Sequence, residues 1–322
     1  MALPINVPDL LRSSSQMTTE RDKPLHIVIV VDPDAPDELV NVVRERFRPS
    51  TSNVRLQVDV ADPSVRVTLR DSTDVVIGVI GTGRTNMAEI LADARERAIP
   101  SLAIGLAEDV HVVARAAGHP SGDCVASPDA EAVLDDQVAD WLVEHLSGKR
   151  LALARNFEFV RKAVSEEAVK ATAFQNALIG TVVIIPGADM PLMTLNQGKM
   201  LLQIAAAYGQ PLGAQRVKEL AAIIGGGFAF RAVARQLLVL IPGFGWAIKG
   251  AVAYGGTMAM GKAAVAYFEE GADLSDVAGR LVEVRDAAMA RLRSDRKALK
   301  RTADELTAAR AAQETGEGPS EL

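Results

Sequence analysis

The step Ile-Pro-Gly occurs twice between apolar stretches of this chain, at residues 185–187 and 241–243. Proline cannot continue a helix and glycine readily ends one, so each step predicts a sharp break between two helices. Both steps lie within residues 171–268, which contain seven Lys/Arg and two Asp/Glu, a net charge of +5. The whole chain of 322 residues carries −6. The sequence therefore predicts two helical hairpins in a basic, sparsely charged zone.

Small residues recur on the last of these apolar helices. We expect helices at about 160–185, 190–208, 215–241 and 246–268. Residues four apart share one face of a helix, and a face without large side chains lets another backbone approach closely. A tight helix–helix contact is therefore predicted for the alanine and glycine stripe of the last helix, Ala247, Ala251, Gly255, Ala259 and Ala263.

Residues 24–148 have a different pattern, in which short apolar runs alternate with polar segments of helical character. The runs occupy 26–31, 54–60, 74–80, 101–106 and 123–127, and the helical candidates occupy 36–47, 86–97 and 129–147. Apolar runs without alternation are typical of strands buried on both faces, and strands that alternate with helices are typical of parallel sheets. We therefore predict an α/β domain with a mostly parallel sheet.

The remaining segments are polar or charged. Residues 1–23 have no long apolar run and are predicted to form a disordered arm. A charged bridge at 149–170 is predicted to begin a long helix, so the helical hairpin domain spans 149–270. Residues 271–313 carry apolar residues at spacings of three and four, which predicts an amphipathic helix, and 314–322 are predicted to be a disordered tail.

The segment after the first apolar run lacks the residues that phosphate binding requires. A phosphate-binding loop needs glycines, whose backbone amides converge on the phosphate, and a lysine. Residues 32–37 contain three aspartates and two prolines, with neither glycine nor lysine. This composition predicts that no nucleotide is hydrolysed at this position.

A second loop, at residues 81–86, is the candidate anion-binding site. It follows the third apolar run and places Gly81, Gly83 and Thr85 ahead of a predicted helix. Backbone amides and the helix dipole could hold an anion or a nucleotide there. The alternative is an ordinary glycine turn in which Thr85 or Asn86 caps the helix.

No catalytic constellation is evident elsewhere. Asp109 and His111 are expected to be a helix-start acid and a surface histidine, and Cys124 a buried apolar residue. We therefore predict no catalytic residue, no metal site and no cofactor. Nucleic acid is disfavoured as a partner, because the chain is acidic (pI ≈ 5.4) and its basic zone lacks stacking aromatic residues.

The arginines of the basic zone bear on whether it crosses a membrane. Arg231 and Arg235 lie one turn apart in the third predicted helix, and each costs about 2.5–3.5 kcal/mol at the centre of a membrane span. A hairpin that embeds partway costs less, because Lys249 and Lys262 can then also reach anionic headgroups. The alternative is a water-soluble bundle whose arginines lie on the surface or pair with Asp189.

A set of proline, glycine and charged positions runs in a fixed order through the helical domain. These signature residues are Pro186, Gly187, Asp189, Gly225, Arg231, Arg235, Pro242, Gly243 and Gly255. Because these residues follow one another in this order, residues 165–268 resemble bacterial domain-of-unknown-function family 697. This family occurs in YcjF-like membrane proteins and beside Era-type small GTPases. The resemblance implies membrane association, often with a GTPase partner domain, and no established catalytic activity.

The strand order of residues 24–148 also resembles an Era-type GTPase domain, with a strand pair at 54–60 and 65–69. Residues 32–37 replace the phosphate loop, and the guanine-reading position at 106–109 keeps the final acid alone. The resemblance therefore implies a degenerate GTPase-like domain that does not bind GTP.

These observations predict a non-enzymatic scaffold or regulatory protein of the bacterial cytoplasmic (inner) membrane. Its α/β domain would face the cytosol, its hairpins would bind anionic lipid, and its C-terminal helix would bind a second copy or a protein partner. Two alternatives remain open. One is a soluble helical interaction module, and the other is an enzyme that binds a nucleotide with the loop at 81–86.

Overall fold

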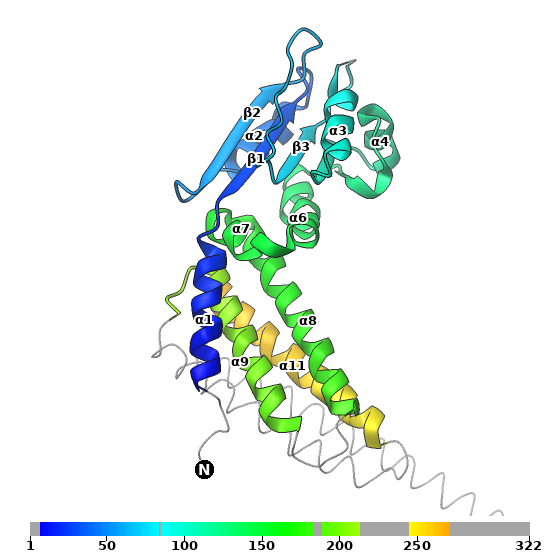
Figure 1. Ribbon diagram of the computed structural model, residues 1–322. Coiled ribbons are helices and arrows are strands. Elements are labelled where there is room, and N and C mark those ends of the chain that lie inside the picture. Colours follow the sequence, from blue (N-terminus) through cyan, green and yellow to red (C-terminus); the bar gives the residue numbers. More distant parts are fainter. Residues whose placement is uncertain (1–6, 84, 183–188, 213–244, 271–322) are drawn as a thin grey trace, which may run out of the picture.

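The computed structural model describes residues 7–83, 85–182, 189–212 and 245–270. A sheet with its covering helices lies at one end of a bundle of longer helices (Figure 1). The five strands pair in parallel in the order β2-β1-β3-β4-β5. They are β1 (Leu25–Val31), β2 (Val54–Val60), β3 (Val75–Val79), β4 (Ser101–Leu106) and β5 (Cys124–Ser127). The predicted parallel α/β fold is confirmed.

Helices cover both faces of the sheet. One face packs against α2 (Asp37–Arg46) and a continuous helical stretch made of α5 (Ala130–Ala132), the π-helix Val133–Val138 and α6 (Ala139–His145). The other face packs against α3 (Met87–Glu96) and α4 (Val110–Ala117). Almost every residue of β1, β3 and β4 is buried, which explains why these runs show no polar alternation.

The prediction of a strand at 65–69 is wrong. These residues form no strand, although Val67 and Leu69 are buried against the α3 face of the sheet. Side chains at the two ends of α3 bind carbonyls of the segment: Arg97 Nη1 donates to Leu69 O at 3.1 Å and Asn86 Nδ2 to Val65 O at 3.3 Å. Because side chains satisfy these carbonyls, the segment packs on the α3 face without joining the hydrogen-bond ladder of the sheet.

The predicted charged bridge at 149–170 is not one helix. After the short turn Ser147–Lys149, α7 (Arg150–Asn156) ends before the 3-10 turn Glu158–Val160, and α8 (Arg161–Val182) begins beyond it. The buried Asn156 causes the break, because its Oδ1 accepts from the Thr51 amide at 3.1 Å and its carbonyl from Ser50 N at 3.2 Å. The sheet core continues through α7 and the start of α8, past the expected boundary at residue 148.

The prediction of a disordered arm is wrong for most of residues 1–23, because Val7–Arg21 form helix α1. Leu10 is 1% exposed and packs at Gly198 of α9 (Asp189–Ala207), where an added Cβ would lie 2.9 Å from a Leu10 methyl. The Ser14 hydroxyl also donates to Leu212 O at 2.7 Å. One buried leucine among serines and threonines is a weak local signal, so the sequence pattern of residues 7–21 does not predict this helix.

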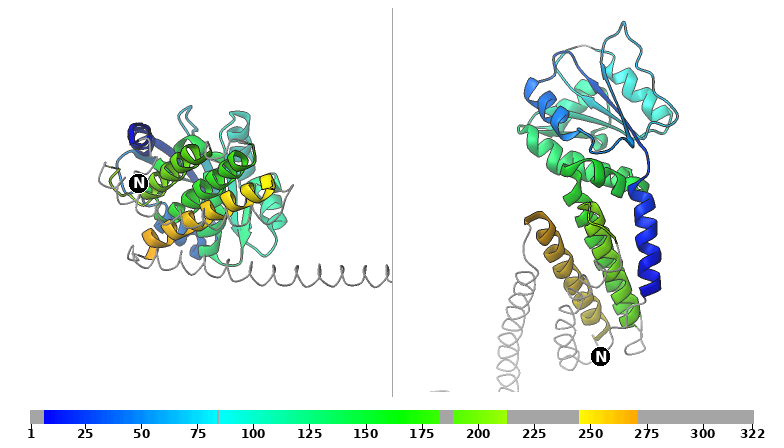
Figure 2. Two further views of the ribbon diagram at one scale, coloured as in Figure 1. Left: turned by 90° about the horizontal axis from the view of Figure 1, so that it is seen from below. Right: turned by 90° about the vertical axis from the view of Figure 1, so that its left-hand side faces the viewer.

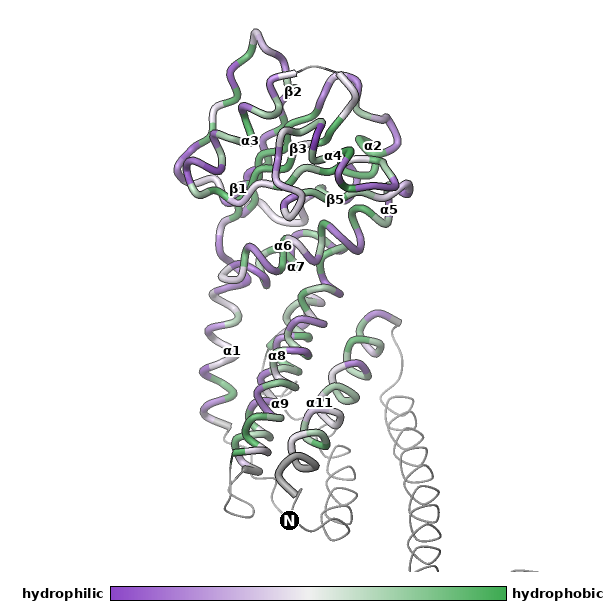
Figure 3. Tube along the Cα trace, turned by 90° about the vertical axis from the view of Figure 1, so that its right-hand side faces the viewer, coloured by the Kyte–Doolittle hydropathy of each residue, from purple (hydrophilic) through white to green (hydrophobic). Residues whose placement is uncertain are grey.

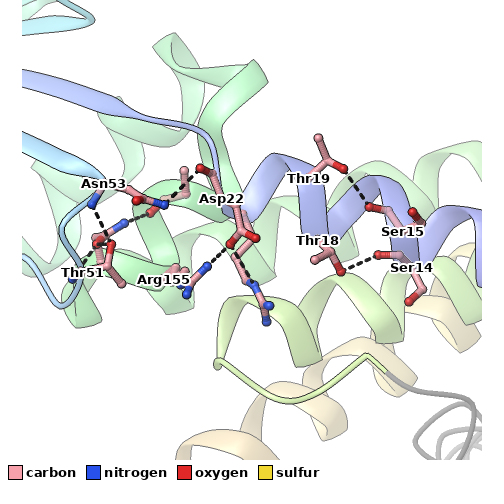
Figure 4. A network of polar contacts seen from close by, with 11 residues as sticks. Ser14, Ser15, Thr18, Thr19, Asp22, Thr51, Asn53 and Arg155 are labelled. Atoms are coloured by element: carbon pink, nitrogen blue, oxygen red, sulfur yellow. Dashed lines mark hydrogen bonds and ion pairs between the residues drawn. The ribbon is translucent and has the colours of Figure 1, made fainter.

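Polar contacts join the end of α1 to the α/β part (Figure 4). Asp22 forms an ion pair with Arg155 of α7, and Asn53 Nδ2 donates to Asp22 O at 3.2 Å. Asn53 lies in the loop before β2, so the turn that follows α1 contacts both α7 and the edge of the sheet. These contacts orient α1 along the bundle (Figure 1).

The described helices of the bundle agree with the predicted ones to within a few residues. They are α8, α9 and α11 (Gly245–Glu270), and α8 contacts both α9 and α11. Figure 2 shows them lying beside one another in two further directions of view. The helix predicted at 215–241 and the segments at 271–313 and 314–322 lie outside the described residues, so the arrangement of two hairpins stays a prediction.

We predict that Leu10→Ala destabilises the protein by about 2–4 kcal/mol, because it removes a fully buried side chain from the contact between α1 and α9. The matched control is Leu11→Ala on the same helix, where the side chain is 42% exposed and the effect should stay below about 1 kcal/mol. Urea unfolding followed by circular dichroism measures both. Equal effects of the two substitutions would contradict the docking of α1.

Candidate functional site

The strand order places a topological switch point between β1 and β3. The chain leaves β1 toward β2 on one side and leaves β3 toward β4 on the other. In open parallel sheets, ligands bind in the crevice that opens at the carboxyl ends of two such strands. The loop after β1, at 32–36, and the loop after β3, at 80–86, meet at this crevice through hydrogen bonds. The two loops singled out in the sequence are therefore one site.

Carboxylates of the first loop accept hydrogen bonds from backbone amides and hydroxyls of the second loop. The Gly81 amide donates to Asp32 Oδ2 at 2.9 Å, and the Thr85 hydroxyl donates to Asp32 Oδ1 at 2.6 Å. The Thr82 amide and hydroxyl donate to Asp34 Oδ2 at 2.9 and 2.7 Å. The hydrogen bonds from Thr82 hold the pKa of Asp34 below its usual range. Asp32 is 4% exposed, so its carboxylate depends on these partners.

This arrangement leaves little capacity for an external anion. A phosphate would have to displace the carboxylates from the amide and hydroxyls and would lie beside two negative charges. A Cβ at Gly81 would collide with Asp34, so the glycine accommodates the protein's own acid. The geometry favours the ordinary-turn interpretation of Gly81, Gly83 and Thr85. Thr85 contributes to the helix start by accepting from the Met87 amide at 3.3 Å.

The other chemically suggestive residues have structural roles. Asp109 caps α4 by accepting from the His111 amide at 2.9 Å, as expected for a helix-start acid. Cys124 is 6% exposed, and burial raises the pKa of its thiol to about 11. A thiol with this pKa stays protonated at neutral pH and is a poor nucleophile. The expectation of a buried apolar cysteine is confirmed.

A groove of about 750 Å³ opens at the amino ends of β1 and β2, away from the crevice. The buried His26 lies there with Nδ1 3.3 Å from Ser72 Oγ, and burial, with nearby Arg55 and Arg70, lowers its pKa. Asp74 accepts from the His26 amide at 2.8 Å and from Lys149 Nζ at 2.7 Å. These contacts join the sheet to the start of α7. Sequence patterns missed this cluster because its members come from distant segments.

A second polar cluster lies inside the bundle. The fully buried Thr257 of α11 accepts through Oγ1 from Asn176 Nδ2 at 3.0 Å and from Gln197 Nε2 at 3.2 Å. Asn196 Nδ2 donates in turn to Asn176 Oδ1 at 3.1 Å. This network joins α8, α9 and α11 and fixes their register, since each buried amide requires its partner.

Two positions of the small-residue stripe do not form the predicted contact within the described structure. Ala251 and Gly255 are exposed, and a Cβ added at Gly255 would meet open space. Gly250 and Gly261 instead face α8, where added Cβ atoms would collide with Thr181 and Val169. Positions seven and eleven apart return to the same face of a helix, whereas five residues at a spacing of four drift about 160° around it. The prediction of a tight contact is therefore wrong at Ala251 and Gly255 with respect to α8 and α9.

The remaining signature positions are not described, with one exception. Asp189 is the first residue of α9. The others, Pro186, Gly187, Gly225, Arg231, Arg235, Pro242 and Gly243, lie outside the described residues. Across the described ranges, no group of three histidine, cysteine or acidic residues is arranged to hold a metal ion.

No family model, curated protein or solved structure matches the chain. The resemblance to domain family 697 and to Era-type GTPases therefore stays a prediction, and the proposed function depends on the geometry.

We predict that Asp32→Ala destabilises the protein by about 1–3 kcal/mol, because it leaves the buried Gly81 amide without its acceptor. Asp34→Ala is the matched control and should cost less, because Asp34 is exposed. Thermal unfolding compares the two variants. Addition of GTP, ATP or NAD should leave the melting temperature of the wild-type protein unchanged. A clear shift with any of them would contradict the conclusion that Asp32 and Asp34 fill the crevice.

A second matched pair tests the helix interface. Gly261→Ala should destabilise by about 1–3 kcal/mol, because the new methyl group has no room beside Val169. Gly255→Ala should be neutral or stabilise by up to about 1 kcal/mol, because alanine favours a helix and the site is open. Urea unfolding distinguishes the two outcomes. The reverse order would show that α11 presents its other face to α8.

Proposed function

We propose that this protein is a non-enzymatic scaffold or regulatory protein that attaches to the anionic cytoplasmic membrane through its helical bundle. Its nucleotide-incompetent α/β domain would face the cytosol. The observation that carries the proposal is a row of exposed apolar side chains on α8. They are Phe174, Leu178 and Val182, which are 61%, 49% and 72% exposed.

This row has the position that a membrane contact requires. Its residues follow one another every four positions, so they share one face of α8 toward the end of the helix that points away from the sheet (Figure 1). Leu192, 51% exposed, lies in the first turn of α9 at the same end. Figure 3 shows the hydrophobic colouring of that end of α9. Clustered exposed side chains of this size mark an interaction surface.

The properties of the helices favour attachment at the lipid surface. Within the described ranges, every helix is too short or too polar to cross a bilayer. An exposed apolar face on a helix can bury into the headgroup region, and the net +5 charge of residues 171–268 favours anionic lipid. The C-terminal segment at 271–313 would contribute self-association or a protein partner.

The filled crevice supports the non-enzymatic part of the proposal. The switch point is where an α/β domain of this strand order binds a ligand, and Asp32 and Asp34 occupy its donors. A degenerate GTPase-like origin is compatible with this filling, although the strand pair of the resemblance is missing at 65–69. An enzyme that binds a nucleotide at residues 81–86 is the less favoured alternative.

Liposome flotation tests the proposal. The wild-type chain should float with vesicles that contain anionic lipid and bind less to neutral ones. The double variant Leu178→Glu/Val182→Glu should reduce the bound fraction about tenfold or more, because each leucine or valine contributes about 1.5–3 kcal/mol when buried. The matched control is Val112→Glu on α4, a residue 53% exposed in the α/β part, which should bind like the wild type.

Two outcomes would overturn membrane attachment. The first is wild-type protein that stays in the soluble fraction with and without anionic lipid. The second is equal binding by the double variant and the Val112→Glu control. If the wild type stays soluble and monodisperse, the same apolar row would define a soluble protein-interaction module.

A further inference from the structure

The edge strand β2 presents an open surface that is independent of the bundle. It is the outermost strand of the sheet and pairs with β1 alone (Figure 1). Val58 and Val60 near its carboxyl end are 59% and 54% exposed. A strand edge of this length with exposed valines is a template for pairing with another strand.

The backbone of β2 divides into groups that face the sheet and groups that face outward. Leu25 N donates to Asn53 O at 3.0 Å and Ala61 N donates to Val31 O at 2.9 Å. In a parallel pair, alternate residues direct both backbone groups to the neighbouring strand, so the odd-numbered residues of β2 face β1. Val54, Leu56, Val58 and Val60 therefore direct their N–H and C=O groups outward. No other described segment forms a backbone ladder with them.

We propose that two copies of this chain pair through β2, antiparallel, about a two-fold axis at Gln57. In this register Val54 faces Val60 of the second copy and Leu56 faces Val58. These four residues carry the outward backbone groups, so the facing pairs can exchange hydrogen bonds. Gln57 faces Gln57 of the second copy as a non-hydrogen-bonded pair. All seven residues of β2 are then paired with the second copy.

The charges of the strand select this register. With the axis at Gln57, Arg55 faces Asp59 of the second copy, and symmetry makes this pair twice. Opposite charges that face each other across strands stabilise the pairing, and like charges destabilise it. An axis at Arg55 or at Asp59 would oppose two arginines or two aspartates. An axis at Leu56 or at Val58 would keep the ladder but would place neither Arg55 nor Asp59 opposite a residue of the other charge. If the axis lay between two residues, the outward backbone groups of one copy would face residues whose backbone groups point toward β1. The hydrogen-bond ladder between the two copies could then not form.

The apolar side chains support the same pairing. Val54 and Leu56 are partly buried beside the core of the α2 face, whereas Val58 and Val60 are exposed. Antiparallel pairing places the exposed pair of each copy beside the partly buried pair of the other. The apolar face then continues from one sheet into the next, with the Arg55–Asp59 pairs on the opposite face.

A cross-linking experiment on the full chain tests the register. Residues of a non-hydrogen-bonded antiparallel pair have Cα atoms about 4.5 Å apart, within the range for a disulfide. Gln57→Cys should therefore form a covalent dimer under mild oxidation. Arg55→Cys is the matched control, because its two copies would lie about 13 Å apart along the strand. The native Cys124 is buried and does not compete.

A charge exchange tests the same pairing without new cysteines. Arg55→Asp or Asp59→Arg alone should raise the dimer dissociation constant about tenfold or more, because each opposes like charges twice. The double variant should restore dimerisation, since the exchanged pair is again complementary. Arg95→Asp on α3 is the control for the change in net charge, and analytical ultracentrifugation measures all four.

A proline variant tests the backbone contribution. Val58→Pro removes an outward N–H that β1 does not use, so the monomer should fold and the dimer should be lost. Three results would overturn the proposal: a wild-type monomer at every concentration, a dimer indifferent to the charge exchange, or equal cross-linking of Gln57→Cys and Arg55→Cys. Membrane attachment predicts none of these results, so the two proposals fail independently.

Discussion

The burial of β1, β3 and β4 on both faces is the constraint on which the rest of the structure depends. Strands without a solvent face require helices on two sides, and the chain supplies α2 and α6 for one side and α3 and α4 for the other. The core of the α2 face also takes in α7 and the start of α8. The orientation of the bundle therefore follows from the sheet, because α8 leaves directly from that core.

The same topology explains why the crevice at the switch point is filled. Parallel strands bring the ends of β1 and β3 together, and the loops that follow them must satisfy their backbone groups there. Asp32 and Asp34 satisfy the amides of Gly81 and Thr82, a role that a bound phosphate has in nucleotide-binding folds. A site with its own carboxylates in place is suited to hold two loops together, which is consistent with a scaffold.

Two surfaces of the described residues are available for partners, and they differ in chemistry. The α8 row of Phe174, Leu178 and Val182 is a helix face without charge, which suits lipid or an apolar partner surface. The β2 edge combines backbone donors and acceptors with one arginine and one aspartate in mirror positions, which suits a copy of itself. A dimer through β2 would place two bundles on one assembly. Avidity for a membrane would then increase without any new lipid contact.

The sequence alone determined the parallel α/β part and the positions of α8, α9 and α11, because periodicity and the residues that break helices are local properties. It also determined that residues 32–37 cannot form a phosphate loop. Tertiary structure decided the rest. The hydrogen bond from Gly81 to Asp32 joins residues 49 apart, and Leu10 becomes buried because α9 returns beside it. The face of α11 against α8 was decided by Thr257, whose buried partners come from two other helices. Such contacts depend on how distant segments meet, which no local pattern records.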